Sequence, residues 1–560
     1  MRDYLSIYKS WCEQAHEDID LVKELKEIEG HQDKIEDAFY RELEFGTGGL
    51  RGVLGAGTNR MNIYVIRKAT QGFANYLNNH FKNPTVAISY DSRIKSDVFA
   101  KTAAEVFAAN GIKVHIYKEL MPTPNLSYAV RELHCSGGIM VTASHNPSKY
   151  NGYKVYGEDG CQITTNAAKE ILGEIEKIDP FKDVKFVKFD EALSKGTISY
   201  ISDEIFEIFI ARVEKESVLF GDEINKDLKI IYSPLNGTGL KPVTTILRKN
   251  GYNVSVVPEQ EKPDGNFPTC PYPNPEIREA MELGIEYAKK NNADLFIATD
   301  PDCDRVGTAV KDNKTGEYVL ITGNQMGVLL LDYICSQRIK HNKMPKNPVA
   351  VKTIVTTDMA LPIAKHYGVK IKEVLTGFKY IGEQILFLEQ KHEEDSYIFG
   401  FEESYGYLSG SYVRDKDAVD GSFLIAEMFS YYKTRGISLI EKLDELYKEY
   451  GYYSAYLNSF AFEGSAGAKK MQEIVEKFRQ GKVEFKGYTI DKVIDYEKGI
   501  DDLPKSNVVK MIFKEGHTVV IRPSGTEPKI KIYFSITGNS IKENEEVYKS
   551  LLEVINKEVK

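Results

Sequence analysis

The chain has 560 residues, of which 42% are hydrophobic and 28% charged, and its formal net charge is -9 at pH 7. This length is too great for one hydrophobic core and predicts roughly three to five domains, and the acidic balance excludes a broad basic surface for nucleic acid or anionic membranes. No apolar run could cross a bilayer and no signal-peptide core follows Met1, so we expect a cytoplasmic protein with neither a nucleic-acid nor a membrane partner.

The first two hundred residues predict an α/β domain that follows a short helical start. Charge and broken apolar periodicity over the first forty residues indicate one or two surface helices. After them come a strand at 85–90, a helix at 99–110 and strands at 112–117 and 139–142. Such alternation of strands and helices is typical of α/β layers.

The chain lacks the sequence signatures of nucleotide and zinc sites. The glycine-rich segment 44–52 (Glu-Phe-Gly-Thr-Gly-Gly-Leu-Arg-Gly) invites a dinucleotide interpretation, but that fingerprint needs glycine where Arg51 stands and a strand before it, and no P-loop sequence occurs. We interpret this segment as a flexible loop that carries Arg51 to a phosphate. The six cysteines have neither C-x-x-C pairs nor zinc spacing, which fits reduced thiols.

The strand at 139–142 runs directly into the polar segment 142–147 (Thr-Ala-Ser-His-Asn-Pro). Here the hydroxyl of Ser144, beside His145, can act as a nucleophile; a turn held by local side-chain hydrogen bonds is the alternative. The sequence G-x-S-x-G of a nucleophile elbow is absent. Segment 151–154 (Asn-Gly-Tyr-Lys) then predicts a tight turn with Lys154, which is either solvated or a general acid or base of lowered pKa.

A second α/β unit begins near residue 204. Its predicted elements are helices at 203–216 and 276–291 and strands at 228–232 and 294–299. Asp300, Asp302 and Asp304 alternate directly after the last strand, so three carboxylates can converge on one cation, and hard oxygen ligands suit Mg²⁺. A calcium-binding EF-hand would need glycine and glutamate where Arg305 and Lys311 stand. An acidic surface turn is the less favoured alternative.

A third unit repeats the α/β scheme, and the last unit differs from it. The predicted elements of the third unit are strands at 349–355, 370–375 and 396–400 and a helix at 359–367. Those of the last unit are antiparallel strands at 508–513, 518–521 and 529–534 and a helix at 541–557.

Two further polar segments belong to these units. Segment 400–406 (Gly-Phe-Glu-Glu-Ser-Tyr-Gly) places carboxylates and a hydroxyl between glycines, which suits the reading of sugar hydroxyls or an ordinary acidic loop. Segment 522–529 (Arg-Pro-Ser-Gly-Thr-Glu-Pro-Lys) combines an arginine, hydroxyls and backbone N–H groups as a phosphate cradle, with a plain hairpin turn as the alternative.

The pattern as a whole predicts three similar α/β domains with mixed sheets and a smaller C-terminal α+β domain. The expected domain boundaries are 1–203, 204–321, 322–447 and 448–560. Polar segments follow strands in every domain, and the carboxyl ends of strands are where open α/β sheets usually hold their chemistry.

In this order, the polar segments together resemble those of the α-D-phosphohexomutase superfamily, and the resemblance covers nearly the whole chain. In that family four domains each give one loop to a central cleft. The glycine-rich segment and 376–379 (Thr-Gly-Phe-Lys) look like the phosphoglucomutase and phosphopentomutase branch. The bacterial phosphomannomutase type generally has histidine where Phe378 stands, so no histidine relay is expected there and Lys379 is left as the polar contact.

The resemblance implies a role for each motif. Ser144 is the phosphoserine, His145 and Lys154 are both candidates for proton transfer, and Arg51 is a further catalytic group. The implied ligands of Mg²⁺ are a phosphate oxygen of Ser144, Asp300, Asp302 and Asp304. The implied substrate contacts are Arg305, Thr376, Gly377, Lys379, Glu402, Ser404, Arg522, Ser524, Gly525 and Thr526.

The activity implied by the resemblance is interconversion of glucose 1-phosphate and glucose 6-phosphate, through a phosphoserine enzyme and a bisphosphorylated sugar, with glucose 1,6-bisphosphate as activator. Mannose phosphate or pentose phosphate is the alternative substrate, and a sugar-bisphosphate synthase is a further alternative. A non-catalytic sugar-phosphate-binding protein is the rival from another class; a lost serine or a broken aspartate triplet would mark it, and both are intact. The expected oligomeric state is monomer or dimer.

Overall fold

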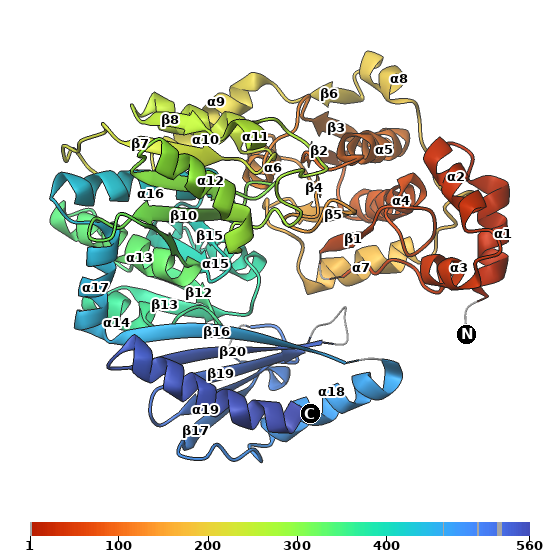
Figure 1. Cartoon of the computed structure of the whole chain (residues 1–560). Coiled ribbons are helices and arrows are strands. Elements are labelled where there is room, and N and C mark those ends of the chain that lie inside the picture. The colour runs from red at the N-terminus through yellow and green to blue at the C-terminus, as the bar shows by residue number, and fades with distance from the viewer. Residues whose placement is uncertain (1–2, 47, 463, 501–502, 524–528, 560) are drawn as a thin grey trace. The chain divides into compact units, whose positions relative to one another are not determined.

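A computed structural model describes residues 3–46, 48–462, 464–500, 503–523 and 529–559, to which all statements below refer (Figure 1). The chain forms two units. Unit 1 holds Met1–Ile321, Gly382–Glu394 and Gly406–Tyr431, and unit 2 holds Thr322–Ile381, Asp395–Tyr405 and Tyr432–Lys560. Among the described helices, none is long and apolar enough to span a membrane.

The N-terminal segment forms three short helices, α1 (Tyr4–Gln14), α2 (Ile19–Glu27) and α3 (Gln32–Phe39). The expectation of one or two helices is wrong, because three form, and each of them buries one face in the core of unit 1. The ring of Trp11 packs edge-on against Phe39, Tyr64 and Phe181 at centroid distances of 5.5–5.6 Å. The periodicity looked broken because each helix is short and begins anew, as at Asp18, whose side chain caps α2.

The first sheet of unit 1 has six strands in the order β1-β5-β4-β2-β3-β6. Strands β4, β2, β3 and β6 run parallel, and β5 and β1 add to one edge in antiparallel pairing. The strands are β1 (Gly49–Val53), β2 (Thr85–Tyr90), β3 (Lys113–Ile116), β4 (Gly137–Val141), β5 (Tyr150–Gly157) and β6 (Ile198–Tyr200). The helices are α4 (Ile63–His80), α5 (Ser96–Ala109), α6 (Thr123–Glu132), α7 (Thr165–Ile175) and α8 (Phe189–Ser194).

Two expected loops at this edge of the sheet are strands. Arg51 lies on β1 rather than in a flexible loop, and Asn151-Gly152 lies inside β5 rather than in a tight turn. The register pairs Arg51 with Gly152 and Gly49 with Lys154. Pairing along the whole of β5 outweighs the local preferences of these glycines, which normally disfavour strands.

Gly152 is required by the close approach of three strands, and we expect Gly152→Ala to destabilise unit 1. A Cβ at this position would lie 2.4 Å from the carbonyl oxygen of Thr142 and 2.9 Å from that of Leu50, so backbone would have to move. The expected loss is about 2–3 kcal/mol, seen as a lower thermal midpoint. Gly173→Ala, in helix α7 with open space around it, is the matched control and should be neutral or slightly stabilising.

The second sheet of unit 1 has five strands in the order β11-β10-β9-β7-β8. Strands β8, β7 and β9 are parallel, and β10 and β11 pair antiparallel beside β9. The strands are β7 (Lys229–Ser233), β8 (Asn253–Val256), β9 (Leu295–Thr299), β10 (Val306–Lys311) and β11 (Tyr318–Ile321). The remaining elements assigned here to unit 1 are α9 (Asp203–Glu214), α10 (Leu240–Lys249), α11 (Pro258–Glu261), α12 (Arg278–Lys290), β15 (Gly406–Leu408) and most of α16 (Ala418–Thr434).

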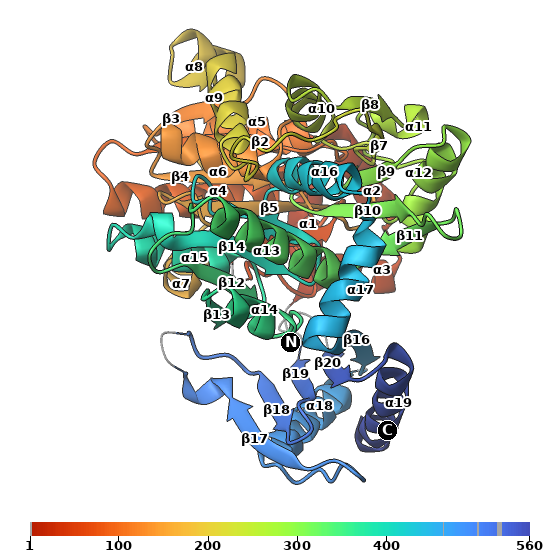
Figure 2. The ribbon, with the colours of Figure 1, turned by 90° about the vertical axis from the view of Figure 1, so that its left-hand side faces the viewer.

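Unit 2 begins with a parallel sheet in which β12 (Val349–Thr353) lies between β13 (Lys370–Val374) and β14 (Tyr397–Glu402). Helices α13 (Gly323–Lys340) and α14 (Ala360–His366) lie beside this sheet (Figure 2). A capping box of Thr322 and Gln325 starts α13. Helix α15 (Lys379–Glu389) begins in unit 2, and 3₁₀ turn η1 (Glu394–Ser396) precedes β14.

The rest of unit 2 is an antiparallel sheet in the order β16-β20-β19-β18-β17. Helices α18 and α19 share an apolar core with it. The elements are α17 (Leu439–Tyr450), β16 (Tyr452–Ala461), α18 (Gly464–Arg479), β17 (Ile490–Asp495), η2 (Tyr496–Lys498), β18 (Val509–Phe513), β19 (Thr518–Pro523), β20 (Lys529–Gly538) and α19 (Ile541–Val559). Three α/β sheets and one antiparallel α+β sheet confirm the expected fold class, whereas the proposed domain boundaries stay predictions.

Candidate active site

The aspartate segment forms a tight loop at the carboxyl end of β9. The carboxylate of Asp300 accepts the backbone N–H groups of Asp304 and Arg305 through Oδ1, at 3.1 and 3.0 Å. Cys303 adopts a left-handed backbone with φ of 51°, which folds the loop back on itself. As a result the side chains of all three aspartates are buried and lie together.

The serine segment is held in an equally restricted loop after β4. Ser144 has φ of 52°, a left-handed conformation that costs a non-glycine residue free energy. Its backbone N–H donates to the hydroxyl of Thr142, which donates to Asp91 at 2.6 Å. The buried guanidinium of Arg93 donates to the carbonyl oxygens of Ser144, Asn146 and Pro147 in this loop and to that of Tyr150, where β5 begins.

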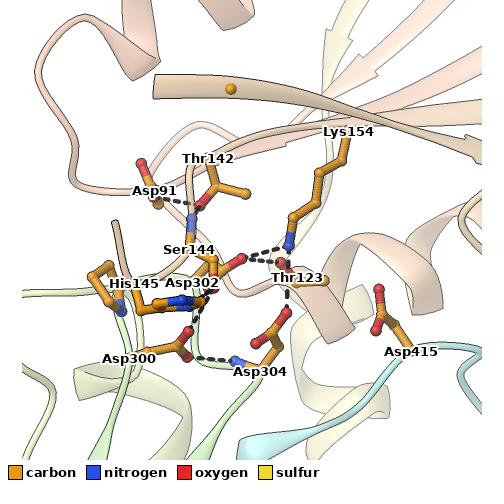
Figure 3. Close-up of polar contacts among 12 residues, drawn as sticks. Asp91, Thr123, Thr142, Ser144, His145, Lys154, Asp300, Asp302, Asp304 and Asp415 are labelled. Carbon is orange, nitrogen blue, oxygen red and sulfur yellow. Dashed lines mark hydrogen bonds and ion pairs between the residues drawn. The ribbon is translucent and has the colours of Figure 1, made fainter. Parts of the chain in front are cut away.

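The two loops meet at the hydroxyl of Ser144 (Figure 3). Its Oγ donates to Asp300 Oδ2 at 2.9 Å and lies 3.1 Å from Nδ1 of His145. Burial, followed by the cations Arg305 and Arg51, holds the pKa of His145 well below its ordinary value. A neutral imidazole beside the hydroxyl is a ready partner for its proton.

Two lysines approach the aspartates from different segments. Lys154 on β5 donates to Asp302 Oδ2 at 2.8 Å and to Asp304 Oδ2 at 3.4 Å (Figure 3). Lys416 forms an ion pair with the same oxygen of Asp304 at 2.8 Å. Burial opposes the charge on Lys154, but Asp302 and Asp304 outweigh it and raise the pKa of its ammonium. Lys154 is therefore a buried cation, and it is neither the solvated lysine nor the group of lowered pKa that the sequence allowed.

The aspartate cluster fits a metal ion. Two ammonium groups pair with these three carboxylates, and one ligand atom from each aspartate lies within 4.8 Å of the others. Within the described part of the chain, Asp302 Oδ1 and Asp304 Oδ1 are buried yet accept no hydrogen bond. Burial and the two neighbouring carboxylates raise the pKa of Asp300 well above its ordinary value. An oxygen-binding cation would satisfy all three observations.

The two candidate arginines have protein partners in unit 1. Arg51 donates from Nη1 to the side-chain oxygen of Asn146, in the serine loop, at 3.3 Å. Arg305 pairs with Glu276, and its Nε lies 3.9 Å from Asp304 Oδ1. Unit 1 thus contains the candidates for the chemical step, which are Ser144, His145, Lys154, Arg51, Arg305 and the three aspartates.

Four further candidates lie together in unit 2. The N–H of Gly377 donates to Glu402 Oε1 at 3.0 Å, and the hydroxyl of Ser404 lies 3.5 Å from Glu402 Oε2. Gly377 has φ of 121°, a conformation that side chains strongly disfavour. The hydroxyl of Thr376 is buried and, among the described residues, accepts or donates no hydrogen bond. The carboxylate can accept hydrogen bonds from sugar hydroxyls, and the two hydroxyls can both donate and accept them.

The two remaining cationic candidates are also in unit 2. Lys379 begins α15 and is mostly buried, with Nζ 5.2 Å from the ring centre of Tyr380. Arg522 lies near the end of β19, opposite Lys531. The pKa of Tyr533 is raised to about 12, chiefly by burial, although a hydrogen bond with Arg522 opposes this shift. Ser524, Gly525 and Thr526 lie outside the described residues.

Sequence reasoning missed four side chains that build the site, namely Asp91, Arg93, Glu276 and Lys416. Asp91 and Arg93 had a local signal, since Asp-Ser-Arg directly follows strand β2. Lys416 lies in the run Arg-Asp-Lys-Asp at 414–417, whose buried charges are rare outside functional or structural networks. No pattern in the sequence pairs Glu276 with Arg305, because that contact depends on the fold.

The chain matches four domain families over most of its length. These are the phosphoglucomutase/phosphomannomutase alpha/beta/alpha domain I at residues 42–182, domain II at 207–315 and domain III at 322–450, and the phosphoglucomutase/phosphomannomutase C-terminal domain at 462–546. Each of the four matched regions therefore contains at least one of the sequence motifs discussed above.

Curated relatives and solved structures agree with these matches. The chain is 38% identical to a phosphoglucomutase of Staphylococcus aureus (strain bovine RF122 / ET3-1) over 94% of this chain and 95% of that protein. It is 36% identical to a phosphoglucomutase of Staphylococcus haemolyticus, over 92% of this chain and 94% of that protein. Its fold is similar to that of pp63/parafusin, a phosphoglucomutase of Paramecium, with a TM-score of 0.69, 19% identity and coverage of 93% and 95%. Its fold is also similar to that of a phosphoglucomutase/phosphomannomutase family protein of Burkholderia thailandensis, with a TM-score of 0.68 and 17% identity. This match covers 92% of this chain and 97% of that protein.

Proposed function

Because this chain belongs to the phosphoglucomutase/phosphomannomutase family of the α-D-phosphohexomutase superfamily, we propose that it interconverts glucose 1-phosphate and glucose 6-phosphate through phosphorylated Ser144. Its family and relatives make it a phosphohexomutase enzyme. The observation that carries the proposed mechanism is the position of Ser144 Oγ, 2.9 Å from Asp300 within a buried carboxylate cluster. The choice of glucose rests on the phosphoglucomutases that the chain resembles.

Each turnover consists of two phosphoryl transfers. In the first, the bond between phosphorus and Oγ of phosphorylated Ser144 breaks, and a bond forms from phosphorus to the free hydroxyl of the sugar phosphate. The sugar hydroxyl gives up its proton and Oγ gains one, which yields a sugar bisphosphate. In the second, the other phosphate returns to Oγ and the isomeric monophosphate leaves. Because both transfers use Oγ, added glucose 1,6-bisphosphate would load the serine and act as the activator.

His145 and Lys154 have different places in this scheme. The imidazole Nδ1 of His145 lies 3.1 Å from Oγ, which supports a role in exchanging a proton with the hydroxyl of Ser144. Lys154 is held on Asp302 and Asp304 instead, where its ammonium can donate to oxygens of the transferring phosphoryl group. Arg51, which reaches the serine loop, and Arg305 are the further donors for these oxygens.

The aspartates would hold Mg²⁺ together with an oxygen of phosphorylated Ser144. When bound, Mg²⁺ supplies positive charge against the charge that develops on the phosphoryl oxygens. One oxygen each of Asp302 and Asp304 accepts no hydrogen bond from the described residues, and this is the reason for assigning the ion to this cluster. Lys154 and Lys416 keep the cluster from carrying three uncompensated negative charges.

The candidates of unit 2 are assigned to the parts of the substrate that do not react. Glu402 and Ser404 would bind sugar hydroxyls, and Thr376, Gly377 and Lys379 would complete that loop. The phosphate that is not transferred would be bound by the cradle formed by Arg522, Ser524, Gly525 and Thr526. A planar guanidinium together with hydroxyl and N–H donors is suited to a phosphate dianion.

A mutase assay tests the proposal directly. Glucose 6-phosphate is measured as it forms from glucose 1-phosphate with Mg²⁺ and a trace of glucose 1,6-bisphosphate, with mannose 1-phosphate and ribose 1-phosphate run in parallel. We expect metal-dependent turnover with the highest kcat/KM for glucose 1-phosphate. A higher value for mannose or ribose phosphate would contradict the sugar assignment, and no turnover on any of the three would contradict the mutase proposal.

A further inference from the structure

A second buried polar network lies in unit 2, with Lys352 of β12 at its centre. The ammonium of this fully buried lysine donates to Asp358 Oδ1 at 2.9 Å, to Glu373 Oε1 at 2.8 Å and to the carbonyl oxygen of Thr356 at 3.1 Å. Burial opposes the charge on Lys352, but Asp358 and Glu373 outweigh it and raise its pKa. One cation therefore fixes the loop after β12 and the strand β13 relative to each other.

The C-terminal sheet joins this network through two side chains. Lys510 on β18 is nearly fully buried, and its Nζ lies 3.2 Å from Glu373 Oε1. The hydroxyl of Thr518, the first residue of β19, donates to Asp358 Oδ2 at 3.3 Å. Burial tends to raise the pKa of Asp358 and of Glu373, but the two lysines lower both. In this part of the network two ammonium groups thus face two carboxylates.

On its other side the network continues into the loop that follows β14. The hydroxyls of Thr353 and Thr356 donate to Glu403 Oε2 at 3.2 and 3.0 Å, and the N–H of Glu403 lies 3.3 Å from the hydroxyl of Thr356. Glu403 is the direct neighbour of Glu402, which accepts the N–H of Gly377. An uninterrupted set of hydrogen bonds and ion pairs therefore runs from Lys510 to the loop proposed to bind the sugar.

An apolar cluster surrounds the same region and takes residues from both sheets of unit 2. Its buried members are Ile354, Val355, Leu375, Tyr496, Val508, Val520 and Tyr533. A buried ion pair contributes little net stability, because desolvation opposes the Coulomb attraction. Such a network instead holds the strands and loops that it joins in one arrangement, because hydrogen bonds have preferred directions.

We propose that Lys352, Asp358, Glu373 and Lys510 are positioning residues, which set the sugar-binding loop at 402–404 relative to Arg522 near the end of β19. None of the four is assigned a substrate contact. Lys510 and Thr518 lie on the strands that lead to the cradle, and Thr356 holds the sugar loop. The inference rests on the proposed function, because it requires that one ligand contact both loops.

Replacing Lys510 by methionine tests this inference. The variant keeps most of the length of the unbranched side chain and removes the charge that faces Glu373. A sugar phosphate needs both loops in register, so we expect KM for glucose 1-phosphate to rise about 10-fold or more, as small misplacements at a site do. Inorganic phosphate has no sugar to place in the loop at 402–404, so its inhibition constant should change less than about 2-fold. A merely structural role would weaken both ligands alike.

Two further variants make the test independent of folding. Thr356→Val removes a hydroxyl from Glu403 without removing a charge, and it should show the same separation between glucose 1-phosphate and inorganic phosphate. Lys477→Met, on α18, breaks an exposed ion pair with Glu558 outside the network and should leave both constants unchanged. Equal weakening of both ligands in Lys510→Met and Thr356→Val, or no effect in either, would overturn the inference. A wild-type chain without turnover on sugar phosphates would overturn the proposed function itself.

Discussion

Ser144→Ala is expected to lower kcat by about 10⁴-fold or more, because the reaction loses the only atom assigned to carry the phosphoryl group. The substitution removes one oxygen and keeps Cβ, so the left-handed backbone of this residue is strained to the same degree. Asp300 loses one of its hydrogen bonds and keeps those from the backbone of the aspartate loop. Steady-state turnover of glucose 1-phosphate measures the loss, and mass spectrometry after incubation with glucose 1,6-bisphosphate measures phosphoryl loading.

The expected loading separates chemistry from folding. The wild-type chain should gain one phosphoryl group on Ser144, and the alanine variant should gain none while its thermal midpoint stays within a few degrees of the wild-type value. Ser199→Ala, on edge strand β6 far along the chain from the serine loop, should load and turn over normally. Appreciable turnover by Ser144→Ala would remove the serine from the mechanism.

Asp302→Asn is the second substitution with a large expected effect. The amide keeps the shape of the side chain, but it removes a negative ligand and places an uncharged group against Lys154. We expect the affinity for Mg²⁺ to fall by at least about 100-fold, since even residues outside the ligand set cost 10–100-fold. The activity at limiting Mg²⁺ should fall with it. Activity and the thermal midpoint are each measured as Mg²⁺ is titrated, and each titration gives the affinity for Mg²⁺.

Removal of the metal from the wild-type chain should mimic this variant. A chelator should abolish turnover, and excess Mg²⁺ should restore it. Asp312→Asn is the matched control, because Asp312 is a half-buried aspartate of the β10–β11 hairpin in the same sheet and lies outside the cluster. If Asp302→Asn bound Mg²⁺ as tightly as Asp312→Asn, the aspartate cluster would not be the metal site.

The contiguous motifs were the most predictable part of this site. Asp300, Asp302 and Asp304 could be grouped from sequence because a tight loop after a strand forces alternate side chains together. Strand β2 was expected at 85–90 and is found there, since six β-prone residues in a buried central strand leave little choice. Both the aspartate motif and strand β2 are determined by residues next to one another in the chain, so the sequence alone is enough to predict them.

The contacts that join distant segments could not be predicted. Lys416 lies 112 residues beyond Asp304, and nothing near either residue signals their ion pair. Arg51 was expected in a loop because its glycine-rich segment has weak strand propensity, yet pairing with β5 makes it a strand. The three N-terminal helices were underestimated because helices of 8–11 residues give too few turns for a clear period.

The left-handed backbone of Ser144 limits how this protein can evolve. Such a conformation costs a residue with a side chain about 1–2 kcal/mol, and glycine would remove that cost. Glycine has no hydroxyl, however, so the most stable residue for this position is also an inactive one. Selection for heat resistance must therefore act elsewhere in unit 1, for instance on contacts such as those of Arg93 that hold the loop in place. At Ser144 itself, stability and catalysis are opposed.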